Sequence, residues 1–345
     1  VTPMKIAINH RVQSGPWGGG NRFVANLTAA LEARGDTVTT ELRGNDTDIV
    51  LMIDPRWRNP AVSFGPGAML RHVAWRDPKT LVIHRINECD ERKGTRGMNR
   101  RLKRANYAAD HTVFVAEWMR RDISVWHDKN AENSSVILNG ADPVTFHAEG
   151  HTPWSGEGPL RLVTHHWGGN WMKGFDTYQR IDELLAQPEW RKRISFTYIG
   201  NLPPGFTFKN ADYVSPLDGD ALADALRSHH AYVTGSINEP GSNHQNEGAL
   251  CGLPVLYLES GALPEYCKGY GVGFGPDTFD DALEEMLRDY PTYAARMTNY
   301  PHIAERTTNQ YIALFEKLIE QRSKLVDARA PFRHPMTFLA NQLPL

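Results

Sequence analysis

Short apolar segments alternate along the chain with longer segments whose apolar residues recur at helical spacing. The alternation starts with an apolar run over 4–9, a helical pattern over 22–34, and two further apolar runs over 37–42 and 48–53. Strands that alternate with helices pair in parallel, because each helix carries the chain back across the sheet before the next strand begins. The pattern therefore predicts an α/β protein with doubly wound parallel sheets and helices on both faces.

The same alternation occurs in two halves of the chain, separated by a short linker. Residues 148–158 contain three glycines and one proline, a composition typical of a connection between domains. We therefore predict an N-terminal domain over 1–148, a C-terminal domain over 149–302, and a C-terminal helix and tail over 303–345. Ligands bind beyond the carboxyl ends of parallel strands, so a ligand cleft is expected between the two halves.

The composition excludes several classes of protein. The chain has 345 residues, enough for two domains with separate cores, and its net charge of −2 argues against general binding to nucleic acid. Its three cysteines are too few and too scattered for a disulfide framework, and its histidines lack metal-ligand spacing with acids or cysteines. No apolar run approaches the ~18 residues of a membrane span, and no signal peptide is visible. We therefore expect a cytoplasmic protein without a metal or a cofactor.

The segment over 232–265 carries the most specific chemistry. It reads as a strand, a glycine-containing loop, a short helix capped by Ser242 or Asn243, and a second strand. Glu239 lies before this helix, and Glu247 lies about one turn inside it. The N–H groups at a helix start attract phosphate, whereas carboxylates accept hydrogen bonds from sugar hydroxyls. The pattern favours a nucleotide-sugar site, and an ordinary turn with two solvated acids is the open alternative.

The spacing of these two acids is similar to a known sequence pattern. Glu239 and Glu247 enclose seven residues, and Cys-Gly-Leu-Pro-Val over 251–255 and Gly-Ala-Leu-Pro-Glu over 261–265 follow in register. This arrangement resembles the E-x7-E block of retaining GT-B glycosyltransferases of family 4. The resemblance implies that Glu239 contacts the donor sugar and that Glu247 contacts the ribose of the nucleotide.

The resemblance also implies a fold and a set of site residues. The fold would be GT-B, with two Rossmann-like doubly wound domains facing a central cleft. The first domain would bind the acceptor and the second the nucleotide sugar, and the final helix could cross back to the first domain. His84, expected at the end of a strand, and Lys173 join Glu239 as catalytic candidates. The donor-binding candidates are Gly18, Gly19, Asn87, Gly174, Gly200, Gly241, Ser242, Asn243 and Glu247.

Several positions depart from the family pattern. The family usually pairs its phosphate-binding lysine with an arginine about five residues earlier. Lys173 matches the lysine, but Gly168 stands at the place of the arginine. Either Lys173 acts alone or another cation substitutes, and the candidates are His165 and Arg22. In the E-x7-E block, the polar His244 and Asn246 stand where apolar residues are commoner.

The glycines after the first strand raise a different class of enzyme. Gly18, Gly20 and Phe23 come one residue short of a dinucleotide-binding fingerprint. Eight loop residues separate Asn9 from Gly18, however, too many for the tight turn of that motif. A nicotinamide-dependent dehydrogenase is therefore a poor second choice.

Basic residues gather in one segment of the first half, in the loop and helix that contain Lys93, Arg96, Arg100, Arg101, Lys103 and Arg104. A solvated helical face is the commoner reason for such a cluster. The alternative is contact of Arg96–Arg104 with anionic lipid at the inner face of the membrane, which would suit a lipid-linked acceptor.

The sequence thus predicts a retaining glycosyltransferase that moves a hexosyl or related group from a nucleotide sugar to a glycan or lipid-linked acceptor. Polysaccharide biosynthesis is the expected setting, and catalysis is expected to need no metal. Two alternatives stay open: a nucleotide-sugar epimerase of GT-B fold, and a non-catalytic protein that binds sugar nucleotides.

Overall fold

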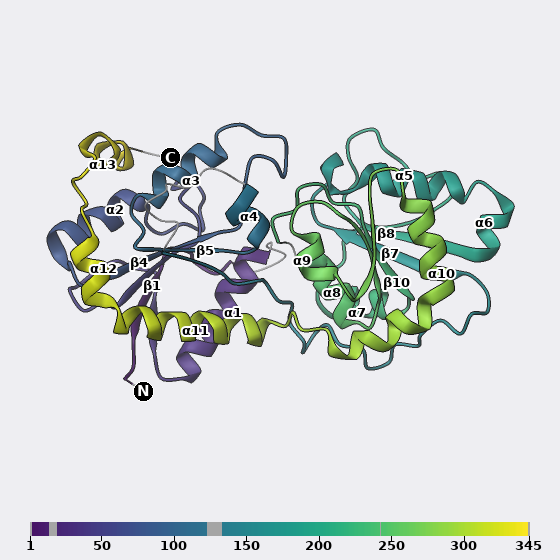
Figure 1. Ribbon diagram of the computed structural model, residues 1–345, viewed down its shortest axis with the longest axis horizontal. Coiled ribbons are helices and arrows are strands. Elements are labelled where there is room, and N and C mark those ends of the chain that lie inside the picture. The colour runs from purple at the N-terminus through teal and green to yellow at the C-terminus, as the bar shows by residue number, and fades with distance from the viewer. Residues whose placement is uncertain (1, 14–18, 123–132, 242, 344–345) are drawn as a thin grey trace. The chain divides into compact units, whose positions relative to one another are not determined.

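The chain folds into two compact units, each built on its own sheet (Figure 1). The computed structural model describes residues 2–13, 19–122, 133–241 and 243–343. The first unit consists of Val1–Asp90, Gly94–Leu138 and Glu305–Leu345. The second unit consists of Glu91–Lys93 and Asn139–Ala304.

The first unit contains a six-stranded sheet in the order β2-β1-β3-β4-β5-β6, and all of its strand pairs are parallel. Its central strands are buried along their whole length, as expected for apolar runs that are covered on both faces. The strands are β1 (Lys5–Ile8), β2 (Thr37–Thr39), β3 (Ile49–Met52), β4 (Leu81–Ile86), β5 (His111–Phe114) and β6 (Ser134–Val136).

Helices cover both faces of this sheet and enclose a core on each (Figure 1). On one face, Phe315 and Leu318 of α11 pack with Leu27 of α1 and Ile6 of β1. On the other face, Met69 and Phe338 pack against the sheet. The helices of this unit are α1 (Gly19–Ala33), α2 (Pro66–Arg71), the π-helix η1 (His72–Arg76), α3 (Met98–Asn106), α4 (Glu117–Asp122), α11 (Ala304–Glu320), α12 (Arg322–Ala328) and α13 (Pro335–Gln342).

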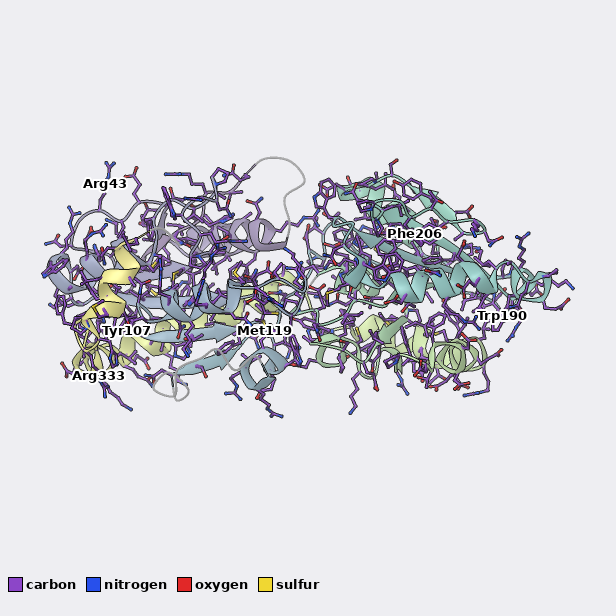
Figure 2. The ribbon with its side chains drawn as sticks, turned by 90° about the horizontal axis from the view of Figure 1, so that it is seen from above. Arg43, Tyr107, Met119, Trp190, Phe206 and Arg333 are labelled. Carbon is purple, nitrogen blue, oxygen red and sulfur yellow. The ribbon has the colours of Figure 1, made fainter. Side chains whose placement is uncertain are left out.

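The second unit contains another six-stranded parallel sheet, in the order β12-β11-β10-β7-β8-β9. Its core combines aliphatic and aromatic side chains, and Phe206 packs onto that core from a loop (Figure 2). The strands are β7 (Leu160–His166), β8 (Ile194–Gly200), β9 (Asp212–Val214), β10 (Ala231–Thr234), β11 (Val255–Leu258) and β12 (Gly271–Phe274). The helices are η3 (Trp171–Lys173), α5 (Phe175–Leu184), α6 (Pro188–Arg193), α7 (Gly219–Arg227), α8 (His244–Leu250), α9 (Leu263–Cys267), α10 (Phe279–Arg296) and η4 (Met297–Asn299).

The strand order of the second sheet creates a place for a ligand. The chain builds outward from β7 through β8 to β9, and then from β10 through β11 to β12 in the opposite direction. The loops that leave the carboxyl ends of β7 and β10 therefore diverge. Such a reversal of strand order opens a crevice in which doubly wound sheets bind their ligands.

The predicted α/β class with doubly wound sheets is confirmed, and several boundaries differ from the prediction. The first unit ends at Leu138 rather than at residue 148, because the residues that follow pack with the second unit. Strand β4 continues through Ile86, so His84 lies inside the strand and not at its end. The C-terminal helix predicted within 303–345 is interrupted at Gln321, between α11 and α12.

The segment Glu305–Leu345 belongs to the first unit. Its α11 side chains Tyr311, Leu314 and Phe315 lie in the same core as the first strands of the chain. The two ends of the sequence thus meet in one unit, and the second unit is inserted between them.

Candidate functional site

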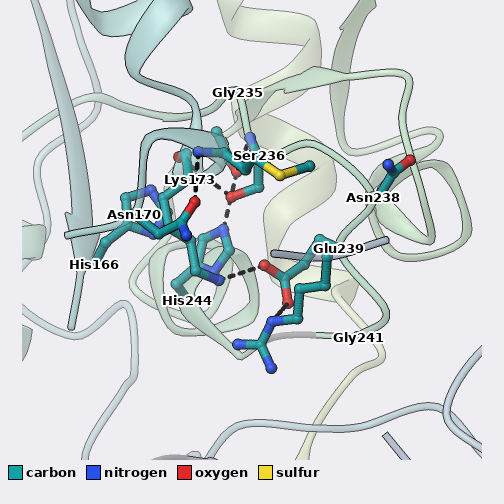
Figure 3. Close-up of polar contacts among 12 residues, drawn as sticks. His166, Asn170, Lys173, Gly235, Ser236, Asn238, Glu239, Gly241 and His244 are labelled. Atoms are coloured by element: carbon teal, nitrogen blue, oxygen red, sulfur yellow. Dashed lines mark hydrogen bonds and ion pairs between the residues drawn. The ribbon is translucent and has the colours of Figure 1, made fainter. Parts of the chain in front are cut away.

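The carboxyl ends of β7 and β10 carry a buried ion pair (Figure 3). Lys173 ends η3, the short helix after β7, and Glu239 lies in the loop after β10. The Nζ of Lys173 donates to Oε2 of Glu239 at 2.5 Å, and Glu239 is only 2% exposed. The pair joins the two loops that diverge from the strand reversal, so it lies at the place where the topology predicts a ligand.

A second cation, Arg92, accompanies this pair. Its Nε lies 3.5 Å from Oε1 of Glu239, so the two carboxylate oxygens face two different cations. Asn238 anchors the same segment, because its side-chain amide donates to the carbonyl of Glu91 at 3.4 Å. The second cation beside Glu239 is thus Arg92, which was not among the substitute cations considered from the sequence, His165 and Arg22.

These cations keep Glu239 ionised. Burial alone would raise the pKa of its carboxyl, but the charges of Lys173 and Arg92 outweigh burial and lower the pKa to about 2. A carboxylate with this pKa is a hydrogen-bond acceptor at neutral pH and does not supply a proton. It can accept the hydroxyls of a sugar.

Close backbone contacts fix the loops around the pair. A Cβ on Gly174, whose φ is +106°, would lie 2.6 Å from the carbonyl carbon of Gly235. The amide of Ile237 donates to the carbonyl of Met172 at 2.8 Å. Only glycine permits this approach, which explains why Gly174 follows Lys173 directly.

The Glu239 loop is also tied to the loop after β11. Asn238 has a left-handed backbone with φ +51°, and its amide donates to Oγ of Ser260 at 2.9 Å. The amide of Ala262 donates to the carbonyl of Glu239 at 2.8 Å. A Cβ on Gly261 would lie 2.5 Å from the Glu239 nitrogen, so Gly261 permits the two loops to touch.

The second predicted acid, Glu247, forms its own buried pair. Its Oε2 lies 2.7 Å from Nε2 of His165, the penultimate residue of β7, and Glu247 is 6% exposed. The Nδ1 of His165 lies 3.1 Å from the hydroxyl of Tyr232 on β10. Glu247 on α8 is therefore oriented from the strands beneath it, close to the same strand reversal.

Two further buried histidines, His166 and His244, pack against each other near this site. The imidazoles of His166 and His244 meet with ring centroids 4.5 Å apart. Nε2 of His244 bonds Oγ1 of Thr234 at 2.9 Å, and Nε2 of His166 bonds the hydroxyl of Tyr178 at 2.5 Å. Burial, with the charge of Lys173 adding to it, lowers the pKa of both imidazoles well below the usual value. The polar His244 is thus satisfied within the fold.

The other polar position of the E-x7-E block is satisfied in the same way. Oδ1 of Asn246 accepts from the hydroxyl of Tyr300 at 2.6 Å. Its Nδ2 donates to the carbonyl of Asn139 at 3.4 Å, and the Asn139 side chain donates to the carbonyl of Gly241. The two polar residues of this block, His244 and Asn246, therefore make buried contacts within the fold.

The remaining candidates of the second unit have clear positions. Gly241 has φ +149° and Gly200 has φ +144°. A Cβ on Gly200 would lie 2.0 Å from the carbonyl oxygen of His166, so this glycine lets β8 close against β7. Asn243 precedes α8, but its side chain makes no capping hydrogen bond. Ser242 lies outside the described residues.

The other predicted site residues belong to the first unit, whereas Lys173, Glu239 and Glu247 belong to the second. His84 is fully buried, its Nδ1 faces the Asn106 amide at 3.1 Å, and burial lowers its pKa to about 3. Asn87 follows β4, with its amide 3.8 Å from the place of a Cβ on Gly20. Gly19 begins α1, one turn earlier than the helix predicted from residue 22. Gly18 lies outside the described residues.

The described residues contain no group of three or more histidines, cysteines or acids that could hold a metal ion. The chain does contain two Asp-x-Asp triplets, over 46–48 and 218–220. In the first, Asp46 bonds Nζ of Lys5 at 2.7 Å and Asp48 accepts from Arg322 at 2.7 Å. Those carboxylates are engaged by cations of their own. Nor is any helix of the described chain long and apolar enough to cross a membrane.

Comparison with known proteins identifies the architecture. No protein-family model matches the chain, and no curated protein sequence matches it significantly. Solved structures do match. Sucrose-phosphate synthase from Thermosynechococcus elongatus is 14% identical, with a TM-score of 0.64 over 92% of this chain and 100% of that one. The fold is GT-B.

Two further solved structures match over the same share of the chain. A glycosyltransferase from Rickettsia africae is 12% identical, with a TM-score of 0.63 over 92% of this chain and 99% of that one. Anabaena HepE in complex with UDP and glucose is 14% identical, with a TM-score of 0.59 over 92% and 99% of the two chains. At such identities the similarity concerns the fold, and the site has to be argued from its own residues.

Arg92 was not predicted from the sequence as a residue of this site. The residue immediately precedes Lys93, the first member of the basic cluster, and was not among the candidates. The signal that could have found Arg92 is its place in the loop that follows β4, because ligands bind beyond the carboxyl ends of parallel strands. The partner is 147 positions away (239 − 92), so spacing alone could not connect the two.

Proposed function

We propose that this protein is a retaining glycosyltransferase that takes its sugar from a nucleotide sugar bound in the second unit. The observation that carries the proposal is the pair of buried carboxylates at the strand reversal, Glu239 with Lys173 and Arg92, and Glu247 with His165. A GT-B fold with acids and a lysine at this place has the groups that a nucleotide sugar requires: acceptors for hydroxyls and a cation for phosphate.

The donor is proposed to lie with its ribose at Glu247 and its sugar at Glu239. A carboxylate held by a neighbouring donor, as Glu247 is by His165 at 2.7 Å, presents its lone pairs in a fixed direction. Anabaena HepE, which shares the fold, was solved with UDP and glucose, and a uridine nucleotide is therefore the first donor to try. A hexose is the corresponding first choice of sugar.

Lys173 is proposed to act on the leaving group. Its ammonium carries three donors, so the bond to Glu239 is compatible with a bond to a phosphate oxygen. Breaking the bond between the sugar and the diphosphate places extra negative charge on that oxygen, and a cation already in position stabilises it without reorganising water. Catalysis then consists of charge stabilisation and orientation of the acceptor hydroxyl, without a metal.

The acceptor is proposed to be a glycan or a lipid-linked glycan, with polysaccharide biosynthesis as the setting. The exposed basic residues Arg100 and Arg101 on α3 are the support for a lipid-linked acceptor, because such residues attract anionic membrane surfaces. Peripheral contact with the inner face of the membrane is the corresponding proposal for location.

The test is incubation of the purified chain with a panel of nucleotide sugars, followed by separation of products. We expect release of the nucleoside diphosphate, by transfer or by slow hydrolysis, with the anomeric configuration of the sugar retained. The Glu239→Ala variant should lose this activity, whereas Glu189→Ala, on the exposed helix α6, should keep it. Interconversion of sugars without release would indicate an epimerase, and binding without any turnover would indicate a binding protein.

A further inference from the structure

The first unit contains a cavity of about 530 Å³ on the carboxyl side of its sheet. Its walls come from Arg11 after β1, from the residues after β2, from Ser63 and Phe64 before α2, and from His72 and Trp75 of η1. The volume lies within the ~300–1,000 Å³ of small-molecule sites. In the strand order β2-β1-β3 the chain reverses direction next to β1, so the cavity adjoins the ligand-binding edge of this sheet.

Positive charge dominates the walls. Four arginines line the cavity, Arg11, Arg43, Arg71 and Arg76, together with one acid, Glu41. Arg43 pairs with Glu41 at 3.1 Å, and Figure 2 shows Arg43 at the outer edge of the unit. Arg71 bonds the neutral amide of Gln342. Within the described chain, Arg11 and Arg76 lie within 4 Å of no carboxylate, so the cavity attracts an anion.

Two residues that line the cavity contain polar atoms without hydrogen-bond partners in the described structure. These atoms are Oγ of Ser63 and Nδ1 of His72, and both are buried. The hydroxyl of Thr80 donates to the carbonyl of Thr47 at 2.8 Å, so it accepts from Nε2–H of His72 at 3.1 Å. In a neutral imidazole that leaves Nδ1 as an acceptor. A ligand hydroxyl would supply the missing donor, and unsatisfied buried polar atoms are costly enough to favour one.

The cavity is built on fixed backbone. Arg11 donates its amide to the carbonyl of Ala61 at 2.7 Å, and the amide of Ser63 donates to the carbonyl of Asn9 at 3.1 Å. The π-helical turn of η1 carries both His72 and Trp75, and such turns are frequent at functional sites. Trp75 is 63% exposed and packs on Phe332 at 5.6 Å between centroids, which supports its indole as an apolar wall.

We propose that this cavity binds an anionic polyol, a sugar that carries a phosphate or a carboxylate. The arginines bind the anionic group, His72 and Ser63 bind hydroxyls, and the Trp75 indole covers the apolar face of the ring. All residues that line this site belong to the first unit. Its identification as the place of the acceptor rests on the proposed function, and it would define the acceptor as an anionic sugar.

Calorimetric titration of the full chain tests the proposal, with glucose 6-phosphate, glucuronate, glucose and inorganic phosphate as probes. We expect glucose 6-phosphate or glucuronate to bind, and whichever is tighter shows which anionic group the cavity prefers. Glucose and inorganic phosphate should each bind at least tenfold more weakly than that probe. Arg76→Gln and Arg11→Gln should each weaken its binding at least tenfold, whereas Arg58→Gln, an exposed arginine of the same unit outside the cavity, should leave binding unchanged.

Four results would overturn the proposal. The first two are that neither anionic sugar binds, and that binding survives the loss of both Arg11 and Arg76. The third is that inorganic phosphate binds as tightly as glucose 6-phosphate. The fourth is that Lys173→Ala abolishes binding, which would place the probe in the second unit. Melting curves of the variants verify folding. Titration with UDP is run in parallel. Binding of an anionic sugar without any UDP binding or transfer would reject the proposed function and leave this site standing.

Discussion

A buried carboxylate stays ionised only where other groups replace the water that it has lost. Glu239 has Lys173 on one oxygen and Arg92 near the other. Removing either cation changes two things at once: the charge available to a phosphate, and the electrostatic balance that keeps Glu239 in place. Substitutions at this site therefore need a readout of binding as well as one of rate.

Lys173→Ala is expected to lower kcat at least tenfold, the effect of about 1.4 kcal/mol of lost transition-state stabilisation. The reason is the loss of the ammonium that faces the leaving diphosphate in the proposed mechanism. Affinity for a nucleoside without phosphates should not change. Lys268→Ala, an exposed lysine of the same unit, is the matched control. Full steady-state activity of Lys173→Ala would show that another cation acts on the leaving group, and Arg92 would be the first to test.

Substitution of the two acids is expected to affect different steps: binding of the nucleotide for Glu247 and transfer of the sugar for Glu239. Glu247→Ala should weaken binding of free UDP at least tenfold, because the proposed ribose contact is lost and His165 loses its 2.7 Å partner. Glu239→Ala should lower the rate of transfer much more than the affinity for UDP, because its proposed contact is with the sugar. Titration calorimetry of both variants measures this difference. Equal losses of UDP affinity would contradict the assignment.

Turnover is expected to survive excess EDTA. The proposed mechanism meets the diphosphate with Lys173, and Glu239 is already engaged by cations on both sides. A metal-dependent site would need acids that can turn toward Mg²⁺ or Mn²⁺. The measurement is the transfer rate with and without chelator at constant ionic strength. If EDTA stops transfer and Mn²⁺ restores it, the charge-stabilisation mechanism is wrong.

The sequence was sufficient to predict which acids are candidates but not what surrounds them. Glu239, Glu247 and Lys173 were assigned by spacing and resemblance, and the structure places all three near the ends of β7 and β10. Arg92 could not be assigned, because its position beside Glu239 depends on folding of a segment 147 positions away (239 − 92). The partner of Glu247 was also missed, since His165 had been considered only as a substitute cation.

Helices α3 and α6 illustrate how two basic helices can differ. On α6, Lys192 pairs with Glu189 at 3.0 Å and Arg193 pairs with Glu284 at 2.5 Å. On α3, Arg100 and Arg101 are exposed and lie within 4 Å of no carboxylate in the described part of the chain. The positive charge of α3 is therefore available to an external anion, whereas the charge of α6 is largely compensated.

Liposomes with anionic lipid are expected to bind the chain through α3. Each cation near an anionic surface contributes about 1 kcal/mol, so Arg100→Gln with Arg101→Gln should lower the binding constant by roughly 30-fold. The same change at Arg191 and Lys192 on α6 is the control and should have little effect. Sedimentation at rising salt gives the readout. Binding that ignores salt, or that both double variants share, would exclude this contact.

Buried strands were the easiest elements to predict, because a short continuous apolar run between turn residues is typical of a buried parallel strand. The second strand predicted within 232–265 is β11, which is buried along its whole length. Short helices such as α6 and α9 were missed, since six and five residues are too few to establish a helical period. The start of α1 at Gly19 was missed because glycines are poor predictors of a helix, and here two of them open it.

Acid stability of the whole molecule is expected to depend on Glu239. Its pKa is about 2 in the fold against 4.5 ordinarily, so its ionised form favours the folded state. Because the folded pKa is lowered, this contribution is complete above pH 4.5 and is lost as the pH falls toward 2. Between these values Tm should fall more steeply in the wild type than in Glu239→Gln, as measured by calorimetry.

The matched control for that measurement is Glu189→Gln, whose side chain is 80% exposed. Its Tm should follow the wild type across the same range of pH. Parallel curves for the wild type and Glu239→Gln would mean that Lys173 and Arg92 do not favour the ionised form of Glu239 in solution.

The return of Glu305–Leu345 to the first unit has a consequence for the order in which the protein is made. The face of the first sheet that α11 covers, through Tyr311, Phe315 and Leu318, stays bare while the ribosome synthesises the whole of Asn139–Ala304. At about 5–20 residues per second this interval lasts roughly 10–30 s. The unit that leaves the ribosome first is therefore the one that finishes folding last, and this apolar face stays exposed to solvent until α11 has been made.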